Sequence, residues 1–304
     1  MDNQNGTNVY AWKQHYIGIH KGYAVIPSLL LFLVLVNNIF IILTFKQVKK
    51  KQFTDAFMCA LAIADLAMFI PITVTVVTFL HGSIIMNGIV CDIWALNTGA
   101  GVSTTALLHC AICIEKCVSI WKPLEHKLFV TRKYSYYVLY AVVIACFIIP
   151  VSYCSILIRF GVLPHVNFDP VKVICIPDFD IPFFLTVGIP FLVCPLVVEV
   201  LTNILILIKV RKLRGARRQQ QLRAVTTVLL TVGVYYLCTC PVGVYMVCSA
   251  VYEMPSIFKF VVHYMILSNS IVNFWIYLRG LPRFQEAFKT LLQLNQSINR
   301  VAPS

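Results

Sequence analysis

The side chains of this sequence that could do chemistry are few, and they lie far apart. Asp65 and Glu199 are acids inside long apolar stretches, whose other polar residues are mainly Asn, Ser and Thr. The pair Cys110 and Cys113 also lies in an apolar run, where a thiol behaves as a small hydrophobic group. No His, Cys and carboxylate residues have catalytic or metal-binding spacing. These residues therefore argue against an enzyme or a cofactor-dependent protein.

The composition indicates that membrane-spanning helices hold these residues. Of the 304 residues, 59% are apolar or aromatic and only 12% are charged, against about 25% charged in an ordinary soluble domain. A net charge of +13 would suggest nucleic acid binding in a soluble protein, but cytoplasmic loops of membrane proteins carry the same excess. We favour the membrane interpretation and expect no nucleic acid partner.

Seven apolar stretches are long enough to cross a bilayer, which needs about 20 residues of helix. The predicted spans are 24–46, 55–80, 89–115, 135–158, 181–209, 224–251 and 257–278. The sequence thus predicts an all-α membrane protein, a seven-transmembrane helix bundle. Pro71, Pro150, Pro190, Pro195 and Pro241 lie within these spans, and each can kink its helix or simply be tolerated there.

The basic residues orient the bundle. With cations near span ends counted in the adjoining loop, the eight non-membrane segments carry 2, 4, 0, 5, 2, 7, 1 and 4 Lys and Arg residues. Basic loops stay in the cytoplasm, so this alternation predicts an extracellular N-terminus and a cytoplasmic C-terminus. We expect a multi-pass plasma-membrane protein with an extracellular tail at 1–23, a seven-span domain at 24–279, and an amphipathic helix and short cytoplasmic tail at 280–304.

Two features of the predicted outer face follow from this orientation. Asn5 begins an Asn-Gly-Thr sequon in the N-terminal tail and is a candidate glycosylation site. Cys91 lies at the outer mouth of the third span, and Cys175 lies in the long loop before the fifth. Both face an oxidising compartment, so we expect a disulfide that ties this loop to the third span.

Short motifs occur in every predicted span except the fourth. They are Asn38 in the first span, Leu61-Ala-Ile-Ala-Asp65-Leu66 in the second, Glu115-Lys116-Cys117 at the end of the third with Lys122-Pro123-Leu124 after it, Pro195 in the fifth, Cys238-Thr-Cys-Pro241 in the sixth and Asn273-Phe-Trp-Ile-Tyr277 in the seventh. Each motif is weak alone, but in this order and at this spacing they resemble those of rhodopsin-like (class A) G protein-coupled receptors.

The resemblance implies coupling to a heterotrimeric G protein through Glu115, Lys116, Cys117 and Tyr277. Lys116 replaces the family's arginine and lacks its planar fork of donors. It could instead be an ordinary lysine that reaches the lipid headgroups. Three further positions depart from the family pattern, which puts conventional signalling in doubt: Thr239 replaces a tryptophan, Asn203 a tyrosine and Phe274 a proline.

Asp65 needs a partner, because an ionised acid in a span costs at least about 2.5–3.5 kcal/mol. The resemblance implies that five polar residues of other helices face Asp65. Together with them, Asp65 could hold a sodium ion as an allosteric cofactor. The alternative is a protonated or water-bridged aspartate that only joins helices. The five residues are Asn38, Thr105, Asn269, Ser270 and Asn273. Glu199 has no counterpart in the family pattern.

The resemblance places a ligand pocket in the outer half of the bundle. Its expected lining is mostly apolar, which suits a small molecule or a short peptide. His263 could contact the ligand or be a packed interhelical histidine. Retinal and aminergic ligands do not fit, because Leu267 and Thr98 stand where opsins and aminergic receptors carry lysine and aspartate. The predicted lining residues are Thr75, Thr98, Val102, Met246 and His263.

Two basic segments face the predicted cytoplasm. After the seventh span, Leu281, Phe284, Phe288, Leu291 and Leu292 form one face of an amphipathic eighth helix that lies on membrane lipids. The loop 209–223 carries seven cations and could contact a G protein or anionic lipid equally well.

Three functions remain open from the sequence. The leading hypothesis is a cell-surface receptor that transmits an extracellular signal to G proteins, with a chemosensory or orphan receptor as the closest type. The second is a decoy or partner receptor of the same fold that binds without signalling. A small-solute transporter is the third, against which stand the lack of an inverted repeat and of paired broken helices.

Overall fold

The protein is a bundle of long helices, seen in a computed structural model that describes residues 24–48, 52–81, 88–130, 133–159, 184–212, 215–249, 252 and 256–301. These residues contain helices and no strand. The elements are α2 (Val25–Gln47), α3 (Phe53–Ala67), α4 (Phe69–His81), α5 (Gly88–Trp121), α6 (Pro123–Val130), α7 (Lys133–Arg159), η2 (Phe184–Val193), α9 (Cys194–Arg211), α10 (Gly215–Ser249), α11 (Ser256–Gly280) and α12 (Pro282–Val301).

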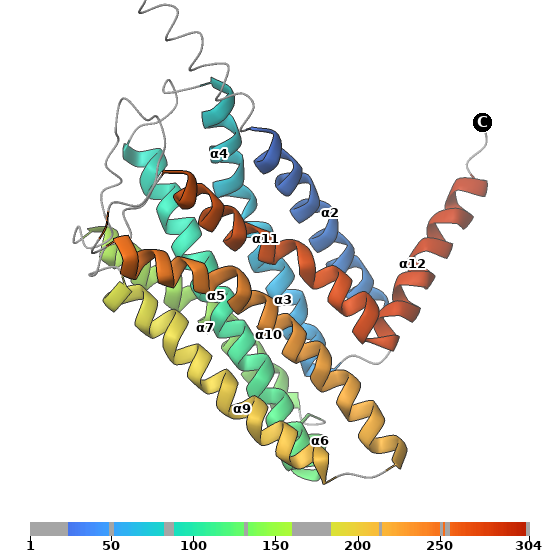
Figure 1. Ribbon diagram of the computed structural model, residues 1–304. Coiled ribbons are helices and arrows are strands. Elements are labelled where there is room, and N and C mark those ends of the chain that lie inside the picture. Colours follow the sequence, from blue (N-terminus) through green and yellow to red (C-terminus); the bar gives the residue numbers. More distant parts are fainter. Residues whose placement is uncertain are drawn as a thin grey trace, which may run out of the picture.

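The outward faces of the helices are apolar, as a membrane requires. Phe32, Ile144, Leu201 and Leu237 are all more than half exposed, whereas most of the Asn residues of the bundle are buried. Within the described residues, six stretches are long and apolar enough to cross a membrane. They lie on α2, α3 with α4, α5, α7, η2 with α9, and α10. With α11 as the seventh long element, the predicted helix bundle is confirmed (Figure 1).

Several predicted spans differ in detail from the helices. The second span is broken at Met68 into α3 and α4. Pro71, three residues later, has no N–H to donate to the carbonyl of Ala67, so the helix loses a hydrogen bond at the break. The fifth begins as a π-helix around Pro190, whereas α7 and α10 run through Pro150 and Pro241 without interruption.

Two helices extend beyond the predicted membrane segments. The third span was expected to end at residue 115, but α5 continues to Trp121. Similarly, α10 begins at Gly215, nine residues before the predicted sixth span, so that part of the basic loop is helical. Polar helical turns of this kind remain stable because each residue added to an existing helix forms its own backbone hydrogen bond.

The last helix leaves the bundle at an angle (Figure 1). α12 follows α11 after Leu281 and packs against α2. Phe284 is fully buried, and its ring lies 5.1 Å from the ring of Phe45 in α2. The apolar face predicted for this segment therefore packs partly against α2, and the rest of it remains available to lipid. We refer to the end of the bundle that carries α6 and α12 as the α12 end.

The junction between α10 and α11 at the α12 end requires a glycine. A Cβ atom added to Gly280 would collide with the Thr227 hydroxyl group of α10. Thr227 cannot easily turn away, because its hydroxyl donates a 2.9 Å hydrogen bond to the Arg223 carbonyl and the residue is buried. The absence of a side chain at Gly280 is what lets the two helices approach.

We expect Gly280→Ala to destabilise the protein by about 1–3 kcal/mol, the usual range for overpacking. Gly233 of α10 has open space around its Cβ position and provides the matched control. Gly233→Ala should be neutral or slightly stabilising, since alanine favours helix more than glycine does. Thermal unfolding in detergent measures both, and equal melting temperatures for the two variants would contradict the close contact.

Candidate functional site

Asp65 lies at the centre of a set of buried hydrogen bonds between α3 and α11. The Ser270 hydroxyl donates to one carboxylate oxygen at 2.8 Å, and the Asn273 amide donates to the other at 2.9 Å. All three residues are at most 3% exposed. We call these residues, together with Asn38, the Asp65 hub. Two of the five partners expected from the sequence thus bond directly to Asp65.

Asn38 joins α2 to the hub through the backbone of α11. Its amide donates to the Ser270 carbonyl at 2.9 Å and to the Val34 carbonyl of its own helix at 3.0 Å. Its neighbour Asn37 donates to the Ile271 carbonyl at 2.9 Å. The first span is therefore held to the seventh by amide side chains. Thr105 and Asn269 are also buried, but no hydrogen bond to Asp65 is seen for either.

Three buried amide oxygens on α2 and α11 have unused bonding capacity. The amide oxygens of Asn38, Asn269 and Asn273 are buried and have no hydrogen-bond partner within the described residues. Hard cations prefer carboxylate, carbonyl and amide oxygens. No group of three His, Cys, Asp or Glu residues in the described part of the chain could hold a metal ion.

Glu115, near the α12 end of α5, has three partners from three helices. Thr54 of α3 donates to one carboxylate oxygen at 2.6 Å. The Nε2 atom of His126 in α6 lies 3.1 Å from the other oxygen, and Lys116 Nζ is more distant, at 3.6 Å. The carboxylate is only 10% exposed. Contact with Thr54 and His126 therefore holds Glu115 more closely than contact with Lys116 does.

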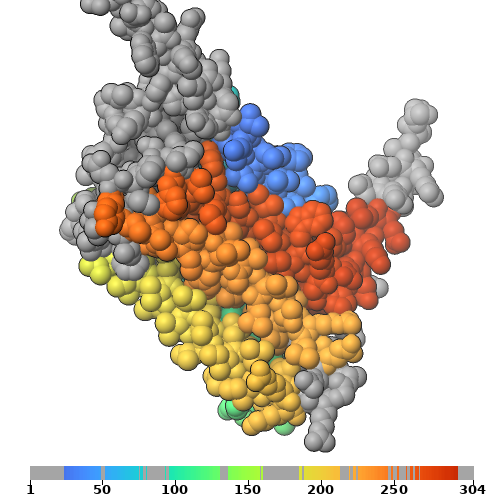
Figure 2. All heavy atoms as spheres, in the orientation of Figure 1, coloured from blue at the N-terminus to red at the C-terminus, as the bar shows by residue number. Residues whose placement is uncertain are grey.

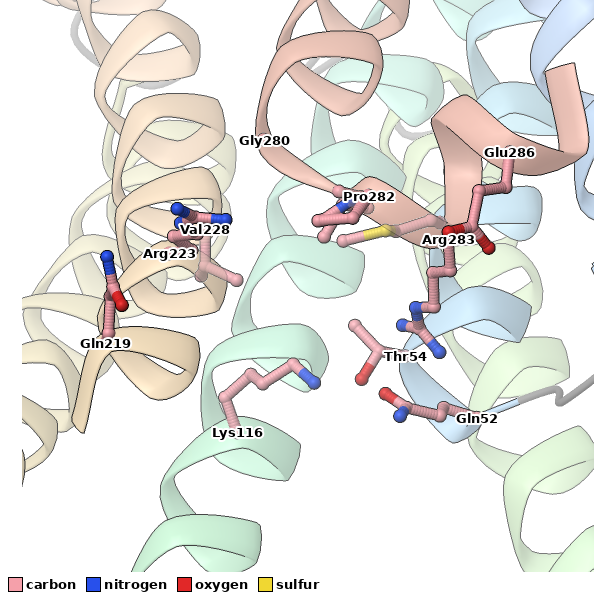
Figure 3. A pocket seen from close by; sticks show the side chains of 12 residues that line it. Gln52, Thr54, Lys116, Gln219, Arg223, Val228, Gly280, Pro282, Arg283 and Glu286 are labelled. Atoms are coloured by element: carbon pink, nitrogen blue, oxygen red, sulfur yellow. The ribbon is translucent and has the colours of Figure 1, made fainter. Parts of the chain in front are cut away.

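Lys116 lines a cavity of about 430 Å³ at the α12 end (Figure 3). Its amine points towards Thr54 at the start of α3, while Arg223 of α10 and Arg283 of α12 approach from other sides. We call this cavity the Lys116 cleft. It is lined by Gln52, Thr54, Met58, Lys116, Gln219, Arg223, Val228, Gly280, Leu281, Pro282, Arg283 and Glu286.

An ion pair that the sequence analysis missed closes one side of this cleft. The Arg283 guanidinium contacts both carboxylate oxygens of Asp55, at 2.7 and 3.0 Å. Asp55, which is 4% exposed, also accepts the Gln52 backbone N–H at 2.8 Å and so caps α3. This pair connects α12 to the start of α3. No motif could have indicated it, because its partners are 228 residues apart.

Tyr277 is fully buried beside this region and packs among aromatic rings. Phe45 and Phe284 each lie 6.1 Å from it, and its hydroxyl has no partner within the described residues. Phe274, which replaces the expected proline, joins the same cluster, with Phe288 of α12 at 5.5 Å. The aromatic side chain therefore links α11 to α12. Cys117 is partly buried beside Lys116.

The expected outer pocket is described only in part. Thr98 is buried and its hydroxyl has no hydrogen-bond partner within the described residues. The Val102 carbonyl accepts a hydrogen bond from the Tyr235 hydroxyl of α10 at 3.2 Å. Predictions that fall outside the described residues or side chains stay predictions. They concern Asn5, Thr75, Cys91, Cys175, Met246 and His263.

Glu199 is a second buried acid, in α9, and it is fully shielded from solvent. Cys110 of α5 and Tyr236 of α10 face its carboxyl group. However, neither carboxyl oxygen has a hydrogen bond of acceptable geometry, because the Cys110 thiol donates instead to the Pro195 carbonyl at 3.4 Å. An acidic group in this setting destabilises a helix bundle when it is charged.

Residues 37–277 match the family described as 7 transmembrane receptor (rhodopsin family). The match includes Asn38, Asp65, the Glu115 and Lys116 pair, and Tyr277, and so covers both the Asp65 hub and most elements around the Lys116 cleft.

We expect Glu199→Gln to stabilise the protein by about 1–2 kcal/mol, because the amide cannot carry the uncompensated charge. Glu286→Gln makes the same chemical change at an exposed position of α12, where effects usually stay within about 0.5 kcal/mol. Thermal unfolding of both variants in one detergent tests this. A clear loss of stability in Glu199→Gln would show that the acid has a stabilising partner.

Proposed function

Because this chain belongs to the rhodopsin family of seven-transmembrane receptors, we propose that it is a plasma-membrane receptor that transmits an extracellular signal to a heterotrimeric G protein. In this proposal the N-terminus is extracellular and the α12 end faces the cytoplasm, as the distribution of basic residues indicates. Ligand binding shifts the helix bundle between two arrangements, one of which opens the cytoplasmic end.

The Lys116 cleft is the observation that carries this proposal. It is a recess of about 430 Å³ between α3, α5, α10 and α12, at the position of the family's coupling motif. Arg223 and Lys116 contribute cationic groups, and Gln52, Thr54 and Gln219 contribute hydrogen-bonding groups. A recess with this lining can accept the carbonyl and carboxylate groups at the end of a partner helix.

The contacts of Glu115 suggest how the cleft switches. Thr54 and His126 restrain the acid, while Lys116 is 3.6 Å away and is the more easily released partner. Lysine offers a single ammonium group, so it cannot form the two parallel hydrogen bonds of an arginine. We therefore propose that the contact between Glu115 and Lys116 holds the resting state only weakly. Lys116 is then available to the G protein, and Tyr277 moves when the aromatic cluster rearranges.

The ligand in this proposal is a small molecule or a short peptide bound in the outer half of the bundle. Support comes from the buried, unpartnered Thr98 hydroxyl on α5. Val102, one turn further along, has its carbonyl bonded to Tyr235 of α10, so a ligand at this level would act on the contact between α5 and α10. Thr75, Met246 and His263 complete the proposed pocket.

A sodium ion at the Asp65 hub is the proposed allosteric cofactor. Asp65 would supply the charge, and the unpartnered amide oxygens of Asn38, Asn269 and Asn273 fit the preference of the ion for oxygen ligands. Thr105 and Ser270 are the hydroxyl groups proposed for the same set. A bound cation would favour the arrangement in which α3 and α11 share these groups.

A receptor that binds without signalling is the second candidate, and it is favoured by the altered residues at Lys116, Thr239 and Phe274. Thr239 is much smaller than the tryptophan it replaces, and its hydroxyl donates to the Tyr235 carbonyl of its own helix at 2.8 Å. Phe274 fixes α11 to α12. Both features could limit the movement that coupling requires.

Nucleotide exchange distinguishes the two candidates. With the native chain in nanodiscs and a panel of G protein heterotrimers, we expect exchange above that of empty nanodiscs, because the contact between Glu115 and Lys116 is weak. Lys116→Ala should lower this exchange about tenfold, the order expected for the loss of one charge-assisted contact.

Lys289→Ala removes a charge from the exposed face of α12 outside the Lys116 cleft and should leave exchange unchanged. If the native chain is inactive while Lys116→Arg restores exchange, the decoy receptor is the better interpretation. The coupling proposal fails if neither chain supports exchange with any heterotrimer.

Sodium is tested by thermal unfolding in NaCl and in choline chloride at equal ionic strength. We expect the native chain to melt at a higher temperature in NaCl, since a ligand that binds only the folded state stabilises it. Asp65→Asn should remove this difference. Asp55→Asn changes a buried acid outside the hub and should keep it, and a native chain that melts equally in both salts would exclude the sodium site.

A further inference from the structure

A second recess lies on the lipid-facing side of the α12 end, between α10, α11 and the start of α12. Its volume is about 670 Å³, within the range of ligand sites. Figure 2 shows the gold inner part of α10 beside the red end of α11 and α12 on one face of the molecule. We call it the arginine groove, and the residues that matter here are Arg223, Leu230, Val272, Trp275, Ile276 and Arg279.

The groove is polar at one end and apolar at the other. Arg223 and Arg279 line the part nearest the α12 end. Leu230 lies seven residues beyond Arg223 in α10, and Trp275 lies one turn before Arg279 in α11, so both are displaced by roughly 6–10 Å towards the membrane interior. Gly280 meets Thr227, so these two residues lie at the same level. Because the two helices are antiparallel, Arg223 lies about one turn nearer the α12 end than Arg279, and both apolar residues lie deeper.

The groups at both ends of the groove have unused binding capacity. Within the described part of the chain, neither Arg223 nor Arg279 forms an ion pair, in contrast to Arg283 with Asp55. Leu230 and Trp275 are each 53% exposed. The groove therefore presents two guanidinium groups at headgroup depth and an apolar wall at the depth of the acyl chains, where a tryptophan also favours the interface.

From this arrangement we infer that the arginine groove binds an anionic phospholipid of the adjacent leaflet. The lipid phosphate contacts Arg223 and Arg279, for which the guanidinium fork is well suited, and one acyl chain lies along Leu230 and Trp275. The inference goes beyond the proposed coupling function and depends only on the membrane depth of the groove.

Binding here would also affect the Lys116 cleft. Arg223 and Gln219 line both recesses, so they form part of the wall between the groove and the cleft. A phosphate that holds Arg223 on the lipid side neutralises one of the cations of the cleft. A lipid bound in the groove therefore lowers the positive charge of the Lys116 cleft, which is the surface that a cytoplasmic partner contacts.

Tryptophan fluorescence provides a direct test, because Trp275 lines the groove. The full chain is placed in phosphatidylcholine nanodiscs that contain a few per cent of either brominated phosphatidylglycerol or brominated phosphatidylcholine. The bromine atoms quench a nearby indole. We expect the anionic lipid to quench at roughly tenfold lower mole fraction than the zwitterionic lipid, as the attraction of two basic residues implies. Trp275→Phe should remove this component from the signal of the four tryptophans.

The double variant Arg223→Gln with Arg279→Gln should bring quenching by both lipids to the same level. Lys212→Gln with Lys289→Gln removes the same charge from exposed residues outside the groove and should change the lipid preference by less than about twofold. Glycerol 3-phosphate, which has a phosphate but no acyl chains, should not relieve the quenching.

Three results would overturn the inference. Equal quenching of the native chain by the two lipids would exclude a specific anionic site, whether or not the variants fold. Relief by glycerol 3-phosphate would show a site for free phosphate. Retention of the preference in Trp275→Phe would place the lipid elsewhere on the protein.

Discussion

The structure depends on hydrogen bonds that pair buried polar groups inside an apolar bundle. Lipid offers no water to replace a missing partner, so a buried amide, hydroxyl or carboxyl group is stabilised when its own helix or a neighbouring helix supplies one. Asp65 meets this requirement with Ser270 and Asn273 at 2.8 and 2.9 Å, and Asn38 adds α2 through the Ser270 carbonyl. Three spans far apart in the sequence are thereby fixed at one level.

Properties that follow from periodicity and composition could be predicted from the sequence. The apolar stretches gave the number of spans. The five expected partners of Asp65 came instead from the resemblance to the family, and two of them bond to it. Properties that depend on pairing between distant residues could not. The Asp55–Arg283 ion pair and the contact of Phe274 with Phe288 need the position of α12, and no local pattern encodes it.

The two ends of the bundle are built from different chemistry. At the α12 end, cationic side chains line a cleft and a groove on the two sides of α10, and Arg223 belongs to both. Towards the opposite end, Thr98 and the Val102 carbonyl are polar groups, and residues such as Tyr245 and Val262 form an apolar core cluster there. The hub joins α2, α3 and α11 between the two ends, while α5 and α10 run past it and carry residues of both ends.

The break at Met68 gives the second span a built-in pivot. A continuous helix must stretch or lose a backbone hydrogen bond before it can bend, but here Pro71 has already removed that bond. The segment α4, which follows the break, can therefore tilt while α3 keeps Asp65 in place. Under the proposed function, this pivot would let the ligand pocket adapt to molecules of different size without disturbing the Asp65 hub.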